Sequence, residues 1–336
     1  MQPRSVLIVG GGNIAGGFDD TRGSDALPLT HAGAFSRNPA FRIAAIVEPN
    51  AERRAAFASR WNVPEVYSKL AELPAHSGAF DVVSICSPTA AHPEDLARAV
   101  ALRPRLIFCE KPLTGDVESS RQAVASCEDA GITLVVNHNR RWAPDLRRLR
   151  DEIREGAWGT MRSATGFYNK GILNNGSHML DLLADLFGTL EPAWAGTPIW
   201  DYWPDDPTIP ASLYARDGFP VLLNAGDARD YAFFELELAL EKAVIRMESG
   251  GGNWRMRRSV DSPTFAGYRA LDAGQIYAGQ YESAMSLAIA EIAVSLDRGT
   301  MPSSSGKSAL ATQELCNTIR RLSESSGAAA QDRKNP

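Results

Sequence analysis

The apolar positions of the first 140 residues fall into short runs that are separated by amphipathic stretches. The runs are rich in valine, isoleucine and leucine, as expected for parallel strands that are covered on both faces. The predicted strands lie over residues 5–9, 42–47, 81–85, 106–109 and 133–136, and the predicted helices over 51–61, 93–102 and 117–130. This alternation predicts a doubly wound α/β domain with a parallel sheet over residues 1–140.

The pattern changes after residue 141. A predicted helix over 144–155 is followed by longer runs that alternate partly between apolar and polar side chains, which is typical of a sheet with one buried face. The predicted strands lie over 161–168, 231–240, 243–248 and 254–259, and two closing helices over 282–297 and 307–324. We therefore predict an α+β substrate domain over residues 141–326 and a flexible tail over 327–336.

Composition narrows the class of protein. The chain of 336 residues has 44% hydrophobic and 22% charged residues, an ordinary globular balance, and its net charge of -5 lacks the basic footprint of a nucleic-acid binder. No apolar run approaches a membrane span or a signal peptide. Four cysteines without C-x-x-C spacing predict buried free thiols and a reducing cytoplasm.

The first apolar run leads directly into Gly10-Gly11-Gly12-Asn13-Ile14-Ala15, which matches the pattern G-x-G-x-x-A. Gly10 permits a tight turn, Gly12 allows close approach of a pyrophosphate, and Ala15 lets the following helix pack on the strand. The N-terminus of that helix would supply free N–H groups to the phosphates. A dinucleotide cofactor is predicted here, although a glycine-rich structural turn is the simpler alternative. The similar string at residues 250–253 lies between two strand-like runs and is interpreted as a hairpin turn.

An acid at the end of the second predicted strand completes this pattern. Glu48 can accept hydrogen bonds from a ribose and would repel a 2′-phosphate, which favours NAD over NADP. Its distance from the glycine loop exceeds the usual spacing of roughly 20 residues. The excess is residues 16–29, an inserted loop that we expect beside the mouth of the cofactor or substrate site. A solvated strand-end acid is the alternative interpretation of Glu48.

Two further segments carry candidate chemistry. Lys111 follows the fifth predicted strand, within Glu110-Lys111-Pro112, where carboxyl ends of parallel strands face a ligand crevice. His178 opens a helix whose buried stripe is predicted as Met179, Leu182, Leu183 and Leu186, with Asp181 placed to orient the imidazole. A histidine that titrates near neutrality is a suitable general base. A surface lysine and a helix-boundary histidine are the alternatives.

Other kinds of catalysis have little support. The five histidines never pair at i+4 and no cysteine cluster exists, so no metal site is predicted. The sequence lacks a G-x-S-x-G elbow, and the Gly-Lys-Ser string at 306–308 is interpreted as a helix start. The loop over 200–217 carries Trp200, Tyr202 and Trp203, which could stack on a sugar or base, form an interface or fill a local core.

Taken together, these segments resemble the Gfo/Idh/MocA oxidoreductase family. The resemblance is carried, in chain order, by the glycine loop, Glu48-Pro49, Ser87-Pro88-Thr89 with His92, Glu110-Lys111-Pro112, Asn137-His138-Asn139-Arg140, and Gly176-Ser177-His178 with Asp181. It implies an N-terminal Rossmann domain and a C-terminal open-faced mixed β-sheet. It also implies a homo-oligomer, a dimer or tetramer, formed through that sheet.

The resemblance further implies NAD(P)-dependent hydride transfer at a secondary alcohol or ketone of a sugar, sugar derivative or nucleotide sugar. Lys111, His178 and Asn174 would be catalytic, although Asn174 stands where the family usually has an aspartate. Besides the glycine loop and Glu48, the implied cofactor contacts are Ser87, Pro88, Thr89, His92, Glu110 and Lys111. The implied substrate contacts are Lys111, Asn137, Arg140, Tyr168, Asn174 and His178.

Two other functions fit the same residues. One is a lyase or glycosidase that uses NAD catalytically by transient oxidation, and the other is a non-catalytic NAD-binding regulatory protein. Net accumulation of NADH would separate the leading hypothesis from the first of these. Failure to turn over any member of a broad sugar and nucleotide-sugar panel, despite tight NAD binding, would favour the second.

Overall fold

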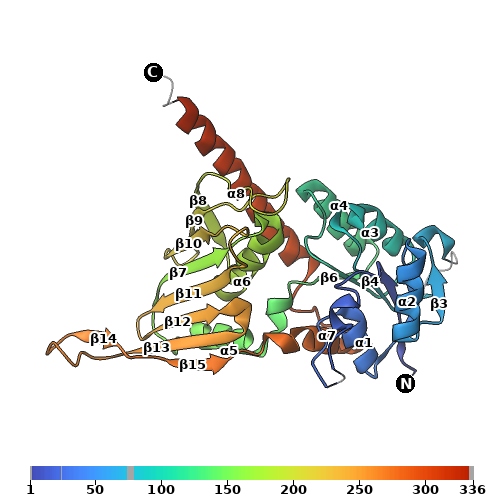
Figure 1. Ribbon diagram of the computed structural model, residues 1–336, viewed down its shortest axis with the longest axis horizontal. Coiled ribbons are helices and arrows are strands. Elements are labelled where there is room, and N and C mark those ends of the chain that lie inside the picture. The colour runs from blue at the N-terminus through green and yellow to red at the C-terminus, as the bar shows by residue number, and fades with distance from the viewer. Residues whose placement is uncertain (1, 24, 74–78, 333–336) are drawn as a thin grey trace. The chain divides into compact units, whose positions relative to one another are not determined.

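The computed structural model describes residues 2–23, 25–73 and 79–332, which form two compact units (Figure 1). Unit 1 comprises residues 1–143 and 282–311, and unit 2 comprises residues 144–281 and 312–336. The chain thus returns to unit 1 at residue 282. The sequence predicted one boundary, between residues 140 and 141, and did not predict this return. Each unit is described separately below.

Unit 1 is built on a six-stranded parallel sheet in the order β3-β2-β1-β4-β5-β6. Its strands are β1 Arg4–Val9, β2 Phe41–Val47, β3 Glu65–Tyr67, β4 Val82–Ile85, β5 Leu106–Cys109 and β6 Thr133–Val136. Its helices are α1 His31–Arg37, α2 Ala51–Trp61, α3 His92–Ala101, α4 Val117–Asp129 and α7 Ala284–Arg298. The strand order reverses between β1 and β4, which is where open α/β sheets bind ligands.

The doubly wound sheet is confirmed, and five of its strands match the prediction within a residue. Central strands β1, β4 and β5 are buried on both faces, which explains their continuous apolar runs. Strand β3 was not predicted, because it has only three residues and lies at the edge with two of them exposed. Its sequence therefore shows no apolar run.

The insertion after the glycine loop interrupts a helix. Residues 12–18 make a single turn, in which the amides of Gly16 and Gly17 donate to the carbonyl of Gly12. Helix α1 then resumes the same helical path, since the amides of His31 and Ala32 donate to the carbonyls of Ile14 and Ala15. In an uninterrupted α-helix the amides of residues 18 and 19 would make these bonds. The insertion therefore adds thirteen residues within what would otherwise be one continuous helix.

Asp19 closes this insertion. Its buried carboxylate accepts hydrogen bonds from the amides of Leu29 and Thr30 and from the Thr30 hydroxyl. The Thr30 hydroxyl in turn accepts from the amide of Gly33 and caps α1. The predicted helix after the glycine loop is thus corrected to one turn, a closed loop and then α1.

Unit 2 is built on a nine-stranded mixed sheet, with the path β14-β13-β12-β11-β7-β10-β9-β8 and with β15 paired to β13. Its strands are β7 Met161–Tyr168, β8 Leu190–Ala195, β9 Ala211–Ala215, β10 Pro220–Ala225, β11 Phe234–Leu240, β12 Ala243–Glu248, β13 Asn253–Asp261, β14 Arg269–Leu271 and β15 Gln275–Ala278. Only the β7–β10 pair is parallel. The predicted mixed-sheet α+β architecture is confirmed.

Helices cover one face of this sheet. They are α5 Pro144–Arg154, α6 Ser177–Phe187 and α8 Gly306–Asp332, the last of which begins in unit 1 and extends beyond its predicted end at residue 324. Gly166 of β7 packs against Met179 of α6, and Trp254 of β13 donates to Asp145 of α5. Alternate residues of β11 and β12 are buried, as predicted for a sheet with one covered face.

Two predictions for the strands of unit 2 have different outcomes, one for a turn and one for the start of a strand. The second glycine string forms the predicted hairpin turn between β12 and β13, with Gly250 at φ 67°. Strand β11 begins at Phe234, three residues later than predicted, because residues 231–233 do not pair with a neighbouring strand. Within the described residues no helix is long and apolar enough to cross a membrane.

Candidate functional site

The glycine loop forms a tight turn at the carboxyl end of β1. Gly10 has φ +89°, and a Cβ atom placed on it would lie 2.7 Å from the backbone nitrogen of Ser87. Any larger residue would therefore push apart the loops that follow β1 and β4. This confirms the turn predicted for Gly10 and brings the predicted cofactor residue Ser87 beside it.

The backbone amides of this loop are available to a ligand. Gly11 N donates to Glu48 Oε2 at 2.8 Å, whereas the amides of Gly12, Asn13 and Ile14 donate to no protein acceptor in the part of the chain that the structure describes. A Cβ atom on Gly12 would meet nothing within 4 Å. Free amides beside open space at the start of a helical turn fit a diphosphate group. Ala15 is fully buried, as the prediction of close packing requires.

Glu48 is a buried acid held against the loop. Its Oε1 atom accepts from the amide of Asn50 at 2.9 Å and lies 3.4 Å from Arg53 Nη1, and its side chain is 5% exposed. It also lines a pocket of about 550 Å³ in unit 1, together with Gly10, Arg53, Leu70, Ser87 and Pro88. The carboxylate retains lone pairs for a ribose hydroxyl. The structure thus places Glu48 where the sequence predicted a ribose contact.

The predicted cofactor residues after β4 have distinct positions. Pro88 is exposed and Thr89 half-buried at the start of a short 3-10 helix. The hydroxyl of Ser87 donates to Asp95, and burial raises the pKa of that carboxyl despite this bond. Of these three residues, Ser87 and Pro88 line the pocket.

His92 links two loops instead of facing the pocket. It is 1% exposed, and its Nε2 atom lies 2.9 Å from the carbonyl oxygen of Ser87. Its Nδ1 atom lies 3.0 and 3.1 Å from the carbonyl oxygens of Pro112 and Leu113. The predicted cofactor contact is therefore corrected to a positioning role, since both ring nitrogens are occupied by backbone groups. The imidazole fixes the loops after β4 and β5 relative to each other.

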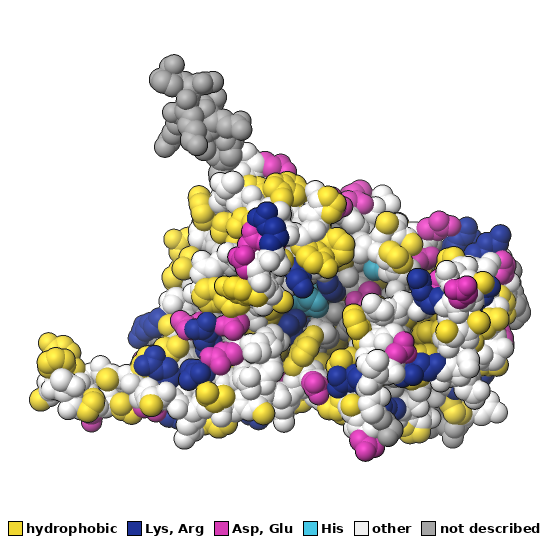
Figure 2. Space-filling view, viewed as in Figure 1, with side chains coloured by type: hydrophobic (Ala, Val, Ile, Leu, Met, Phe, Trp, Pro, Cys, Tyr) yellow, Lys and Arg dark blue, Asp and Glu magenta, His cyan; other side chains and the backbone are white. Residues whose placement is uncertain are grey.

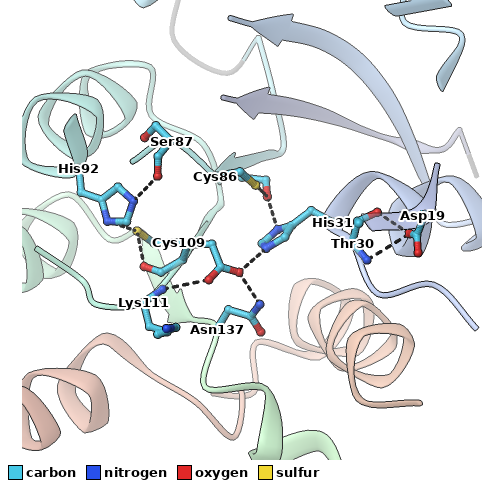
Figure 3. A network of polar contacts seen from close by, with 11 residues as sticks. Asp19, Thr30, His31, Cys86, Ser87, His92, Cys109, Lys111 and Asn137 are labelled. Carbon is cyan, nitrogen blue, oxygen red and sulfur yellow. Dashed lines mark hydrogen bonds and ion pairs between the residues drawn. The ribbon is translucent and has the colours of Figure 1, made fainter. Parts of the chain in front are cut away.

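The carboxylate of Glu110 is bound by other residues of the protein (Figure 3). Its Oε1 atom accepts from Asn137 Nδ2 at 2.6 Å and lies 2.9 Å from His31 Nε2, while Oε2 accepts from the amide of Lys111. The second ring nitrogen of His31 lies 2.7 Å from the hydroxyl of Ser84. The predicted cofactor contact of Glu110 is thus corrected to an internal contact, because its carboxylate is used by three protein groups.

The charges of this network favour an ion pair. Burial raises the pKa of Glu110, but the hydrogen bond and charge of His31 outweigh it and lower the pKa overall. Burial likewise lowers the pKa of His31, yet the neighbouring Cys86 and Glu110 raise it to about 10. His31 is fully buried, and its role in this network was not predicted. It was missed because its partners are 53 and 79 residues away.

Lys111 lies at the carboxyl end of β5, as predicted. It is half-buried, its amide is held by Glu110, and the following peptide bond to Pro112 is cis. Figure 3 shows its side chain beside Asn137. The Oδ1 atom of Asn137 is buried without a hydrogen-bond partner in the described residues, so it can accept from a ligand hydroxyl or amide. Arg140, also predicted to bind substrate, is 8% exposed in the 3-10 helix Asn139–Trp142.

In unit 2, Asn174 and His178 lie on consecutive helical turns. Asn174 belongs to the π-helical segment Gly171–Gly176, and His178 is in the first turn of α6. Asp206 accepts from the amides of Leu173 and Asn174, both at 2.9 Å, and the side chain of Asn174 donates to the carbonyl of Lys170. His178 is half-buried. Asp206 thus fixes the segment that carries both predicted catalytic side chains.

One prediction for this segment needs correction. Tyr168 is fully buried, and its hydroxyl donates to the carbonyl of Ile209, so the structure does not support its predicted contact with a substrate. Burial raises the pKa of its phenol well above the usual range. Asp181 is 1% exposed and accepts from Thr312 of α8. The predicted stripe of Met179, Leu182, Leu183 and Leu186 is buried, together with Leu180, which was not predicted.

The chemistry of the remaining groups is limited. Within the described residues, no group of three or more His, Cys, Asp or Glu side chains could hold a metal ion. Cys86, Cys109, Cys127 and Cys316 are free and buried, as predicted. Asp201 and Asp206, which hold the Asn174 segment, had no sequence signal, because nothing local relates them to residues 30 positions away.

Comparisons with known proteins match the N-terminal part of the chain in sequence. Residues 4–138 match an oxidoreductase family described as having an NAD-binding Rossmann fold. An uncharacterized oxidoreductase, YrbE of Bacillus subtilis, is 30% identical over 138 residues, which are 41% of this chain and 40% of the relative. Inositol 2-dehydrogenase of Rhizobium meliloti is 30% identical over 143 residues, which are 43% of this chain and 42% of the relative. The chain therefore spans less than half the length of these curated relatives.

Solved structures match almost the whole fold. The 3-ketoreductase KijD10 from Actinomadura kijaniata, in complex with NADP and TDP-benzene, has a TM-score of 0.75 at 19% identity, covering 96% of this chain and 98% of that one. An oxidoreductase from Desulfitobacterium hafniense, described as putative and NADPH-dependent, has a TM-score of 0.80 at 14% identity, covering 97% of both chains. At these identities the likeness concerns the fold. The N-terminal part of the chain, residues 4–138, thus matches the Gfo/Idh/MocA oxidoreductase family.

Proposed function

We propose that this chain, as a member of the Gfo/Idh/MocA family, transfers a hydride between NAD and a secondary alcohol or ketone of a sugar, sugar derivative or nucleotide sugar. The observation that carries the proposal lies within unit 1. Free amides at Gly12–Ile14, the buried acid Glu48 and Lys111 all stand at the carboxyl ends of parallel strands of one sheet. That edge is where such sheets bind dinucleotides.

Bound NAD would supply the hydride acceptor at its nicotinamide ring. The residues of the chain would do the rest. The amides of Gly12, Asn13 and Ile14 would hold the diphosphate, and Glu48 would accept from the ribose. Lys111 would donate to the substrate oxygen, with its backbone held by Glu110. His178 would take the hydroxyl proton, because an imidazole can change charge near neutral pH.

The substrate class is supported by the names of the relatives. Besides inositol 2-dehydrogenase, a D-apiose dehydrogenase of Paraburkholderia graminis is 28% identical over 194 residues. Asn137 offers a buried, unsatisfied acceptor next to Lys111, which suits a polyhydroxylated ligand. Asn174 can donate or accept a hydrogen bond but cannot take a proton, so the proposal gives it a positioning role.

Replacing Lys111 by Met tests the proposal. Turnover should fall at least about 100-fold, because a positioned acid–base group contributes typically 10²–10⁴-fold, while the affinity for NAD stays within about threefold. The measurements are net formation of NADH with a panel of sugars and cyclitols, and calorimetric titration with NAD. Lys307→Met, which removes an exposed lysine paired with Glu128 in the same unit, is the matched control. Full activity of the Lys111 variant would overturn the assignment.

We also propose a homo-oligomer, dimer or tetramer, formed through the uncovered face of the unit 2 sheet. Figure 2 shows basic and acidic side chains gathered over β11–β13. These strands carry the ion pairs of Arg246 with Glu235 and of Arg255 with Glu248. Exposed Leu222, Tyr214 and Trp194 lie on neighbouring strands. Such a mixed face fits a protein interface. Light scattering that gives a monomer at micromolar concentration would contradict this.

Four buried thiols without a disulfide support the proposed cytoplasmic location.

A further inference from the structure

Three large aromatic side chains stand exposed on one short loop of unit 2. Trp200 is 55%, Tyr202 56% and Trp203 43% exposed. Single exposed apolar residues need no explanation, but a contiguous group of this size on a soluble protein commonly marks a binding surface. The rings of Tyr202 and Trp203 meet edge to face with centroids 4.9 Å apart, so they form one surface. We call Trp200, Tyr202 and Trp203 the aromatic shelf.

The loop beneath the aromatic shelf is rigid. A β-bridge between Ile199 and Thr208 closes it with two backbone hydrogen bonds of 2.8 and 2.9 Å. Asp201, buried inside, accepts from the amides of Lys170 and Ala228 and from the Thr208 hydroxyl. Because these bonds hold the backbone, a ligand that contacts the rings would pay little conformational entropy to order them.

The same loop is joined to the segment of the proposed catalytic residues. Asp206 holds the amides of Leu173 and Asn174, and the ammonium group of Lys170 lies 5.2 Å from the centroid of the Tyr202 ring. Lys170 precedes His178 by eight residues of largely helical chain, which span on the order of 10 Å. That distance is comparable with the length of a disaccharide. The aromatic shelf is thus placed for a second ring, beyond the one that reacts.

Charge decides which ring-bearing ligand fits. The acids on the loop and the segment that packs against it are Asp201, Asp205, Asp206, Asp227 and Asp230, and the bases are Lys170, Arg229 and Arg320. Five carboxylates against three bases would repel the diphosphate of a nucleotide sugar. The exposed carboxylates of Asp205 and Asp230 can accept hydrogen bonds from sugar hydroxyls, while the rings cover the apolar face of a pyranose.

We propose that the aromatic shelf is a subsite for an uncharged sugar ring that is glycosidically linked to the ring oxidised. The substrate would then be a neutral glycoside or disaccharide rather than a monosaccharide or a nucleotide sugar. This inference rests on the proposed function for the identity of the reacting ring. Binding of a sugar at the aromatic shelf does not depend on the proposed function, because binding can be measured without turnover.

The test is a binding titration of the NAD-loaded protein, by calorimetry or ligand-observed NMR. The probes are methyl glucoside, the neutral disaccharides cellobiose, maltose, lactose and trehalose, and UDP-glucose. At least one disaccharide should bind more tightly than methyl glucoside. Trp200→Ala and Trp203→Ala should weaken that disaccharide roughly 5- to 100-fold, the order found when an aromatic ring stacked on a nucleobase is removed, and leave methyl glucoside unchanged. Trp200→Phe should restore part of the loss.

Two controls keep the result specific. Tyr268→Ala removes an aromatic ring that is 70% exposed on a different loop of unit 2 and should change nothing. Disaccharide binding without NADH formation by the wild-type protein would refute the proposed function but leave the subsite standing. Tight binding of UDP-glucose alone, binding of no saccharide, or a change of oligomeric mass in the tryptophan variants would overturn the subsite.

Discussion

Glu110 and His31 show how a motif residue can act away from the ligand. In sequence, Glu110 stands next to Lys111 and resembles a cofactor contact, yet its carboxylate points to His31 and Asn137 inside the sheet (Figure 3). A buried acid and a buried imidazole stabilise the fold only as a pair, because either charge alone is costly to bury. Because Glu110 also accepts a hydrogen bond from the amide of Lys111, this network fixes the backbone of Lys111.

The pair should make stability depend on pH in two directions. The folded pKa of His31, about 10, exceeds the unfolded value of 6.5, so its contribution is complete below pH 6.5 and is lost as pH rises toward 10. The folded pKa of Glu110 is lowered, so its contribution is present above its unfolded value of 4.5 and is lost as pH falls below it. The pair should therefore stabilise the protein most between about pH 4.5 and 6.5.

His31→Gln tests this directly by urea denaturation across pH 5–10. At pH 6 the variant should be less stable by roughly 3–5 kcal/mol, since it leaves Glu110 buried without its cation. The difference from wild type should shrink as pH approaches 10. The double variant His31→Gln with Glu110→Gln should recover part of the loss, because no charge then remains buried. A difference that does not change with pH would rule out the charged pair.

Glu48 should set cofactor preference. Glu48→Gln keeps the size of the side chain and an acceptor for Gly11, but removes the charge that would repel a 2′-phosphate. We expect the ratio of kcat/KM for NAD over NADP to fall about tenfold or more, as removal of one charged interaction of about 1.4 kcal/mol gives. Glu94→Gln, an exposed acid lining the same pocket, is the control. An unchanged ratio in the Glu48 variant would exclude its ribose contact.

At the scale of elements, the insertion and α1 behave as parts of one helix. His31 and Ala32 bond to Ile14 and Ala15 as if the intervening chain were absent. Removing a number of residues that preserves the helical phase should therefore leave the core face of α1 in place. Any other number rotates that face by about 100° per residue.

Two deletions provide a matched pair. Deletion of residues 18–30 removes thirteen residues, keeps the phase and should fold with a Tm within a few degrees of wild type, while kinetic constants for cofactor or substrate change. Deletion of residues 18–29 removes twelve, turns Phe35 and His31 away from their partners and should lower the Tm by more than about 10 °C. Unchanged kinetic constants in the thirteen-residue deletion would contradict the predicted location of the loop at the site.

The sequence predicted those elements whose apolar pattern is long or continuous. Strands β4 and β5 were found because burial on both faces constrains their residue types to apolar ones. The edge strand β3, the interrupted α1 and the π-helical segment Gly171–Gly176 were not, since their positions depend on distant contacts. The same holds for the site: the glycine loop is local, whereas His31 and Asp206 act through partners far along the chain.

At the scale of the whole molecule, the chain carries two units with different tasks. Unit 1 holds the features of a dinucleotide site, and unit 2 holds His178, the aromatic shelf and an uncovered sheet face. The chain passes from unit 1 to unit 2 and back before ending in α8, so both units depend on segments from two parts of the sequence. The proposed function is hydride transfer between NAD and a sugar-type substrate.

The most direct measurement of that claim follows the hydride itself. The protein is incubated with a ketose or keto-sugar panel and NADH in which both hydrogens at nicotinamide C4 are deuterium, and products are analysed by mass spectrometry. The account predicts a product alcohol that carries one deuterium on the carbinol carbon and forms in equal amount to NAD. Product that forms without deuterium and without net oxidation of NADH would contradict it.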